Sequence, residues 1–278
     1  TATQPAFERR DDFSIGIPPQ EITEIIRDTT SLFQTLERVT CENIGSRSDD
    51  DLISHVLDHA EGGCLLILNT TKAAKTLFEK LSGRTNALHL SARMCPAHVI
   101  AVLDEAKQLP KDGKPVVLVS TQLVEAGVDI SFPVVYRALA GLDSINQAGG
   151  RCNRNGELPE PGAVHVFIAP KPAPPGLLRK GEDTTRELAS SSGFIPDKPE
   201  SFNRYFEKYY SSINEQGEMM EENLVKDVNP EGHVQFRTAG REFRLIKELS
   251  IPIIVLYGAN DKLIQPLLFA GPSRQVMR

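Results

Sequence analysis

Between residues 39 and 170, short apolar runs alternate with segments of helical periodicity, and this alternation restricts the fold more than any other feature. The expected strands are Val39–Ile44, Cys64–Asn69, Ala87–Leu90, Val116–Ser120, Val134–Ala138 and Val164–Ala169. Nearly continuous apolar strands that are separated by helices are typical of a parallel sheet with helices on both faces. We therefore expect an α/β domain over residues 39–170.

Three further segments are expected outside this domain. Residues 1–38 are interpreted as an interdomain linker with a helix around Pro19–Arg38, and residues 171–200 as a Pro- and Ser-rich linker with little structure. Residues 201–278 begin with an expected helix, Ser201–Ile213, in which four aromatic residues recur at helical spacing. Such a stripe either stacks on nucleic-acid bases or forms core, and core is its commoner role.

Composition narrows the class of protein without identifying it. No apolar run approaches the length of a membrane span, so we expect a cytoplasmic protein without membrane contact. The four cysteines lie far apart and form no C-x-x-C pair, so we expect neither structural zinc nor a disulfide framework, and we assign no metal ligands. The net charge of -6 is unusual for a non-specific nucleic-acid binder. A cleft can nevertheless hold one strand with hydroxyls, amides and a few arginines.

Most of the functional signal lies in Val116–Gly156. Thr121 follows a strand at its carboxyl end, where ligands gather in open α/β sheets, and its hydroxyl can hold a phosphodiester. Asp129 comes two residues after Gly127 and is placed to accept a hydrogen bond from a ribose hydroxyl or from an arginine. An ordinary turn aspartate is the alternative.

The second half of this stretch predicts a helix that presents two arginines. Asp143 and Ser144 are typical of a helix start, and Gln147 stands where it would complete a capping box with Ser144. Gln147, Arg151 and Arg154 are spaced four and three residues apart, so their side chains would share one helical face.

Two glycines, Gly149 and Gly150, interrupt the expected helix. Each weakens a helix by about 1 kcal/mol relative to alanine, which suggests that another group must approach the backbone closely there. Two guanidinium groups beside such a gap can fork onto the oxygens of a phosphate. The alternative is a solvated helix whose arginines pair with Glu157 or Glu160.

Together these residues resemble the fifth and sixth motifs of superfamily 2 helicases. Ser120–Gln122, Glu125–Asp129 and Gln147–Gly156 look like the motifs of the CRISPR-associated helicase-nuclease of type I systems. Cys64–Thr71 is similar to the fourth motif, whose strand ends in Asn-Thr, and His89–Met94 resembles the segment that follows it. The resemblance implies a second RecA-like domain, a parallel sheet with helices on both faces, followed by a linker and a short partial C-terminal segment.

The resemblance also implies a role for individual residues. On the nucleotide side, Arg154 would be the arginine finger, Arg151 a second γ-phosphate contact, and Gln147 the residue that orients them. The same side would be lined by Gly127, Asp129 and Gly150. The expected contacts with the DNA backbone are Thr121, Asn69, Thr70 and Arg93.

A larger machine follows from the same resemblance. Its members unwind DNA with ATP and cut it with a separate metal-dependent domain, so the intact enzyme would track 3′ to 5′ and degrade foreign DNA. The expected partners are single-stranded DNA, an RNA-guided surveillance complex, and the first RecA-like domain and nuclease domain of the same protein. That first domain would hold most of the ATP and Mg²⁺, because Gly113-Lys114 is followed by Pro115 and no P-loop is present.

Both ends of the chain extend the resemblance. Thr1–Pro5 resembles the third helicase motif, which closes the first RecA-like domain, so we expect a fragment that is inactive by itself. Phe243–Tyr257 resembles the passage from the helicase core to the accessory C-terminal domain of the family, and residues 201–278 would hold the start of that domain.

Other interpretations stay open at this point. Ile251–Pro266 looks like the strand and turn that offer the acid of an α/β-hydrolase, with Asp261 in that role, but no Gly-x-Ser-x-Gly elbow is present. A degenerate helicase half that binds another protein is a further possibility. Val99–Ala106 imitates a magnesium-binding acidic box, yet its spacing favours an amphipathic helix with Asp104 and Glu105 facing water.

Overall fold

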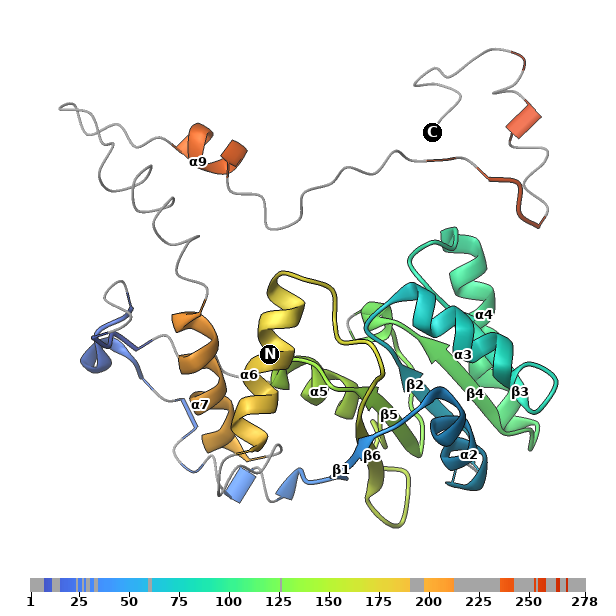
Figure 1. The fold of residues 1–278 in the computed structure, drawn as a ribbon, viewed down its shortest axis with the longest axis horizontal. Helices are drawn as coiled ribbons and strands as arrows, with labels where there is room; N and C mark the ends of the chain where they lie inside the picture. The colour runs from blue at the N-terminus through green and yellow to red at the C-terminus, as the bar shows by residue number, and fades with distance from the viewer. Residues whose placement is uncertain are drawn as a thin grey trace.

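The structure is a computed structural model in which a six-stranded sheet is flanked by helices (Figure 1). It describes residues 8–11, 16–23, 25–26, 28, 31–32, 35–59, 62–125, 127–190, 198–212, 236–242, 253, 255–258, 264–265 and 269. The expectations for Thr1–Pro5 and Asp261 lie outside these residues, as does most of Phe243–Tyr257.

All neighbouring strands of the sheet run parallel, in the order β1-β6-β5-β2-β4-β3. Their bounds are β1 Val39–Ser46, β2 Cys64–Ile67, β3 Asn86–Leu90, β4 Val116–Ser120, β5 Val134–Ala138 and β6 Gly162–Ile168. The six expected strands are confirmed, with ends that differ by up to two residues. Central strands β2 and β4 are buried along their whole length, which is why both read as unbroken apolar runs.

Helices cover both faces of the sheet, as the sequence predicts. The helices α2 Asp49–His59 and α3 Thr71–Leu81 pack on one face through Leu52, Ile53, Val56, Ala74, Leu77 and Leu81. The opposite face carries α4 Pro96–Lys111 and α5 Leu142–Gly149, which contribute Val102, Ala106 and Ala148 to a second core. Asp104 and Glu105 of α4 are exposed, so the amphipathic-helix interpretation of Val99–Ala106 is confirmed.

The expectation of a linker with little structure over residues 171–200 is wrong between Leu177 and Ala189, which form helix α6. The buried face of α6 is made largely of Gly181, Thr184 and Thr185 and of the carboxylate of Glu182, so it lacks the apolar periodicity that marks a core helix. Gly181 permits this packing: a Cβ there would lie 3.2 Å from the Cα of Gly141.

Helix α7, Pro199–Ser211, carries the aromatic stripe that was expected over Ser201–Ile213. Phe202, Tyr205 and Phe206 are buried and pack with Leu142 of α5 and Leu188 of α6. These three rings therefore form core, and the base-stacking alternative is wrong for them. Together α5, α6 and α7 form a group of helices beside the sheet (Figure 1).

The helix expected around Pro19–Arg38 is only partly described. Pro19–Glu21 form the 3-10 turn η1, and residues 31–32 and 35 are helical. Near the other end, α9 Phe236–Glu242 is a short helix. Among the described residues, no helix is both long and apolar enough to cross a membrane. The same part of the chain contains no group of three or more His, Cys, Asp or Glu residues that could hold a metal ion.

A cluster of aromatic and imidazole rings fills the space between α2 and the sheet. The ring centroids of His55 and His165 lie 5.3 Å apart, and Nδ1 of His55 is 2.9 Å from the Tyr136 hydroxyl. Burial lowers the pKa of both imidazoles below the ordinary 6.5, and the neighbouring imidazoles act in the same direction. Glu42, 3.5 Å from His165, opposes this shift without cancelling it. Both histidines are therefore favoured in the neutral form.

We expect the protein to lose stability as the pH falls below about 7. The unfolded chain binds protons at His55 and His165 at a pH where the folded chain does not, so acid favours unfolding. Thermal unfolding between about pH 8 and pH 5.5 should show a shallower pH dependence for His165→Gln than for the wild type or for His98→Gln. An identical slope in all three proteins would contradict this assignment.

Candidate functional site

The carboxyl ends of β2, β4 and β5 meet at one edge of the sheet. Ile67 at the end of β2 pairs with Ser120 of β4 on one side and with Arg137 of β5 on the other. The residues that follow, Asn69 and Thr121, are consequently neighbours at this edge, as expected for a binding site in an open α/β sheet. Both are buried, at 7% and 6% exposure.

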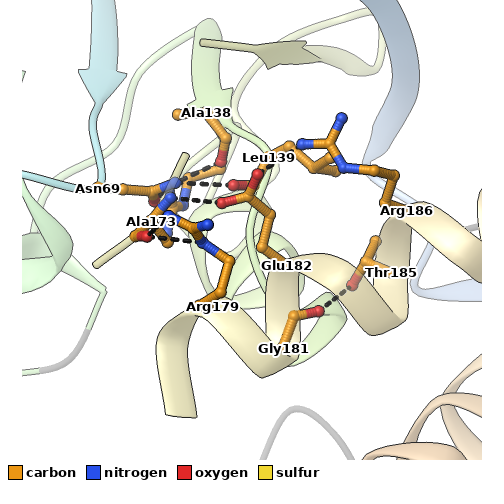
Figure 2. Close-up of polar contacts among 10 residues, drawn as sticks. Asn69, Ala138, Leu139, Ala173, Arg179, Gly181, Glu182, Thr185 and Arg186 are labelled. Carbon is orange, nitrogen blue, oxygen red and sulfur yellow. Dashed lines mark hydrogen bonds and ion pairs between the residues drawn. The ribbon is translucent and has the colours of Figure 1, made fainter. Parts of the chain in front are cut away.

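The side chains of Asn69 and Thr70 are engaged within the protein. The Asn69 amide donates a hydrogen bond of 2.8 Å to the Leu139 carbonyl (Figure 2). Its oxygen accepts one of 2.6 Å from Arg137. Thr70 is the N-cap of α3, and its hydroxyl accepts a hydrogen bond from the Ala73 amide. These contacts hold the end of β2 against β5 and fix the start of α3.

Arg137 is the central residue of this edge, and the sequence analysis did not single it out. Its guanidinium is completely buried, and its Nε lies 2.9 Å from Oε1 of Glu125. It also donates hydrogen bonds to Asn69, to the Ala138 carbonyl and to the Ser144 hydroxyl. An arginine inside the apolar strand Val134–Ala138 was the available signal, because a buried charge requires several partners.

Glu125 completes the buried pair from the loop after β4. Its second carboxylate oxygen accepts a hydrogen bond of 2.6 Å from the Ser144 hydroxyl. Burial raises the pKa of Glu125, and the charge of Arg137 opposes that rise. Arg137 keeps its proton, although burial lowers its pKa, because guanidinium pKa values start so high. The pair and its hydrogen bonds join β2, β4, β5 and α5.

The capping box expected at the start of α5 is wrong. The helix begins at Leu142, with Gly141 as its N-cap and no side-chain cap, and Ser144 is already inside its first turn. The Ser144 hydroxyl bonds to Glu125 and Arg137 instead, which are distant in sequence and invisible to a local pattern. A Cβ at Gly141 would lie 2.4 Å from the Tyr205 hydroxyl, so only glycine fits this start.

The helix also ends earlier than expected, which changes how the two arginines are held. Its last residue is Gly149 and its C-cap is Gly150, so Arg151 and Arg154 stand in the turn that follows and do not share a helical face with Gln147. Asn153 shapes this turn with a φ of 42°, a left-handed conformation that asparagine tolerates. Gln147 is half-buried in the last turn of the helix.

Arg151 is buried and bonded to backbone. Its Nε donates to the Val124 carbonyl and its Nη2 to the Glu125 carbonyl, each at 2.7 Å, and only 7% of the residue is exposed. Burial lowers the pKa of Arg151, with the charge of Arg154 acting in the same direction, and the nearby Asp129 and Glu125 oppose this. Arg151 therefore clamps the turn after α5 onto the segment after β4.

Arg154, by contrast, is exposed. Its Nε lies 3.1 Å from Oδ1 of Asp129, with 39% of the arginine and 80% of the aspartate side chain exposed. Its backbone is fixed, because its amide donates to the Ser131 hydroxyl and its carbonyl accepts from Arg38. A contact between Asp129 and an arginine is one of the two expectations for Asp129, and the structure confirms it. The acidic partner of Arg154 is therefore Asp129 and not Glu157 or Glu160.

The remaining predicted residues are three glycines near the two arginines and Arg93 in the loop after β3. Gly127 has a φ of 72°, a left-handed conformation that favours glycine in the turn leading to Asp129. A Cβ at Gly150 would lie 3.3 Å from the Gln147 carbonyl, whereas one at Gly149 would meet nothing closer than 4.0 Å. Close approach to the backbone thus explains Gly150 in part and Gly149 not at all. Arg93 is exposed in the loop after β3.

Part of this chain is similar to known proteins. Residues 60–157 match the family model "CRISPR-associated nuclease/helicase Cas3, C-terminal". The chain is 50% identical over 68 residues to a CRISPR-associated nuclease/helicase Cas3 of Haloferax volcanii, covering 24% of this chain and 7% of the relative. It is 27% identical over 106 residues to the Cas3 of Methanothermobacter thermautotrophicus, covering 38% and 13% respectively. The chain thus spans a small part of the relatives it matches.

The fold has a counterpart among solved structures. The crystal structure of T. fusca Cas3-AMPPNP superposes with a TM-score of 0.50 at 16% identity, over 66% of this chain and 26% of that chain. The sheet with helices on both faces is a RecA-like α/β fold. Residues 60–157 therefore resemble the C-terminal part of Cas3 nuclease/helicases, as the motifs predict.

Replacement of Gly149 by alanine should stabilise the domain by about 1 kcal/mol, because the site is helical and has room for a methyl group. The melting temperature should rise by about 2–4 °C. Gly141→Ala is the matched control and should lower it, because the added methyl group would overlap Tyr205. A loss of stability in Gly149→Ala would contradict this prediction, because the packing around Gly149 leaves room for the methyl group.

Proposed function

We propose that this chain supplies the second RecA-like half of an ATP-driven motor that moves along single-stranded DNA, within a Cas3-type helicase-nuclease that degrades foreign DNA. The observation that carries the proposal is the contrast between the two arginines of the turn after α5. Arg151 is buried and fixes the turn, while Arg154 stands exposed on a rigid backbone beside Asp129. An arginine finger needs a fixed backbone and a guanidinium that can be released, and Arg154 is held only by the exposed Asp129 and a 3.5 Å hydrogen bond to the Gly150 carbonyl.

Arg154 is proposed to leave Asp129 when a nucleotide is bound between two domains. The present pair is exposed on both sides, and such surface pairs contribute little stability, roughly 0–1 kcal/mol. A triphosphate offers a denser negative charge and two oxygens for a forked contact. Released Asp129 is then available to a ribose hydroxyl. In this proposal Gly127 and Gly150 line the same nucleotide side.

Arg151 and Gln147 are proposed to assist Arg154. Three N–H groups of Arg151 donate to the carbonyls of Val124, Glu125 and Gly150, so a γ-phosphate contact would use the N–H groups that remain. Gln147, in the last turn of α5, is proposed to orient the pair although it does not share a helical face with either arginine.

The DNA side of the proposed motor is the edge where β2, β3 and β4 end. Thr121 and Thr70 would contact phosphodiesters through hydroxyl and amide groups, and Arg93 would add a charge from the loop after β3. Asn69 is proposed to contact DNA as well. Its amide already bonds to Leu139 and Arg137, so its larger contribution is to keep the end of β2 in place.

The rest of the machine is proposed from the family. ATP and Mg²⁺ would be held mainly by a first RecA-like domain that faces Arg154, and a nuclease domain would make the cuts. Single-stranded DNA would be delivered by an RNA-guided surveillance complex in the cytoplasm. A protein-binding module without catalysis remains the second candidate, but the exposed Arg154 on its fixed turn favours the motor.

In the protein that joins this domain to a P-loop domain, Arg154→Ala should reduce ATP turnover about 10³-fold, as expected for an arginine finger. Binding of DNA should stay within about two-fold of wild type, since Arg154 is on the nucleotide side. Arg84→Ala, which removes an exposed arginine in the turn after α3, is the matched control. Normal turnover in Arg154→Ala would remove the finger role from this residue.

Thr121→Val should weaken DNA-stimulated ATP hydrolysis several-fold and leave basal hydrolysis nearly unchanged, because it removes one hydroxyl from the DNA side and conserves shape. Steady-state ATPase with increasing concentrations of single-stranded DNA measures both quantities. Thr76→Val on α3 serves as the control for a hydroxyl far from the strand ends. Equal losses in basal and stimulated rates would reassign Thr121 to the nucleotide side.

A further inference from the structure

The buried pair of Glu125 and Arg137 lies between the two sides of the proposed site. Arg137 donates to Asn69, at the end of β2 on the DNA side. Glu125 belongs to the segment whose backbone carbonyls accept Arg151, on the nucleotide side. The 2.9 Å contact between the two side chains therefore connects both sides through charges that water does not screen.

We propose that Glu125 and Arg137 are positioning residues that make the DNA side and the nucleotide side of this domain move as one unit. The proposal rests on the proposed motor function. Neither residue touches ATP or DNA in it. Arg137 fixes the position of the end of β2 through Asn69, and Glu125 fixes the loop after β4. Arg151 binds the backbone of that loop, so the turn that carries Arg154 follows the position of the loop.

Stability alone is a poor reason for such a pair. Moving two charges out of water costs several kcal/mol for each ion, and apolar side chains of similar size often stabilise a core equally well. What the pair adds is a fixed geometry, because the rigid guanidinium contacts Asn69, Ala138, Ser144 and Glu125 at the same time. If one of these partners moves, the guanidinium must move with it, and its contacts with the other partners change.

A second buried carboxylate extends the network toward α6. Glu182 is 2% exposed, accepts hydrogen bonds from the Ala173 amide and from Arg186, and contributes to the electrostatic field at Arg137 (Figure 2). Helix α6 also packs on the start of α5, where a Cβ at Gly181 would lie 3.2 Å from the Cα of Gly141, so α6 borders this network.

The test removes the charges and retains the volume. The variant Glu125→Leu/Arg137→Met should remain folded with a lower melting temperature, because an apolar pair can replace a buried ion pair but leaves the acceptors of Asn69, Ala138 and Ser144 without their donor. Hydrogen exchange at the amides of Arg151 and Cys152 should nevertheless rise about tenfold, while exchange in α2 stays unchanged. Lys75→Met/Glu79→Leu, which removes an exposed pair on α3, is the matched control and should leave both regions as they are.

The second measurement is the ratio of DNA-stimulated to basal ATP hydrolysis in the protein that carries a P-loop domain. That ratio should fall about tenfold in the double variant, within the usual range of coupling between sites. A normal ratio in a folded double variant, with wild type stimulated by DNA, overturns the coupling and leaves the motor function standing. If DNA does not stimulate ATP hydrolysis in the wild type, the proposed motor function is wrong. The hydrogen exchange of the Arg151 amide in the double variant, compared with the wild type, then decides whether the pair positions the turn.

Glu125→Gln keeps the inference testable if the double variant does not fold. Glutamine conserves the shape and removes the charge, and its single amide oxygen can face Arg137 while its NH2 group donates to the Ser144 hydroxyl. It should fold and should lower the stimulation ratio several-fold. An unchanged ratio together with unchanged exchange at Arg151 would show that the pair only fills the core.

Discussion

Burial of the Arg137 charge is the constraint on which the rest of the site depends. A guanidinium without water must find a partner for its charge and several acceptors for its N–H groups. Here the partners come from β2, β5, α5 and the loop after β4, so these elements can only meet in one register. The edge of the sheet at which ligands gather in this fold class is thereby given a fixed shape.

That fixed edge separates the two arginines that the motif presents as equivalent. Arg151 donates hydrogen bonds to the carbonyls of Val124 and Glu125, so its position depends on that of the buried pair. Arg154, three residues later, has its backbone tied to Ser131 and Arg38 but its side chain in solvent beside Asp129. A group that must reach a phosphate across a domain boundary needs this second environment, because a buried guanidinium cannot move without breaking the fold.

Much of the fold could be predicted from the sequence because apolar runs and helical spacing report burial directly. All six strands and the aromatic face of α7 were found in this way. Helix α6 was missed because Gly181, Thr184 and Thr185 bury small and polar surfaces that hydropathy does not register. The capping box failed for a related reason, since Ser144 met partners that are distant in sequence.

The same limit explains which part of the candidate site the sequence reveals. The spacing drew attention to Gln147, Arg151 and Arg154. It assumed helical periodicity beyond Gly150, where the helix has already ended. Arg137 and Glu125 carry no motif of their own, and their importance appears only when strand order brings β5 next to β2. Residues that lie close together in the sequence leave a local pattern, while Arg137 and Glu125 are joined by a contact across the sheet, which a linear pattern does not contain.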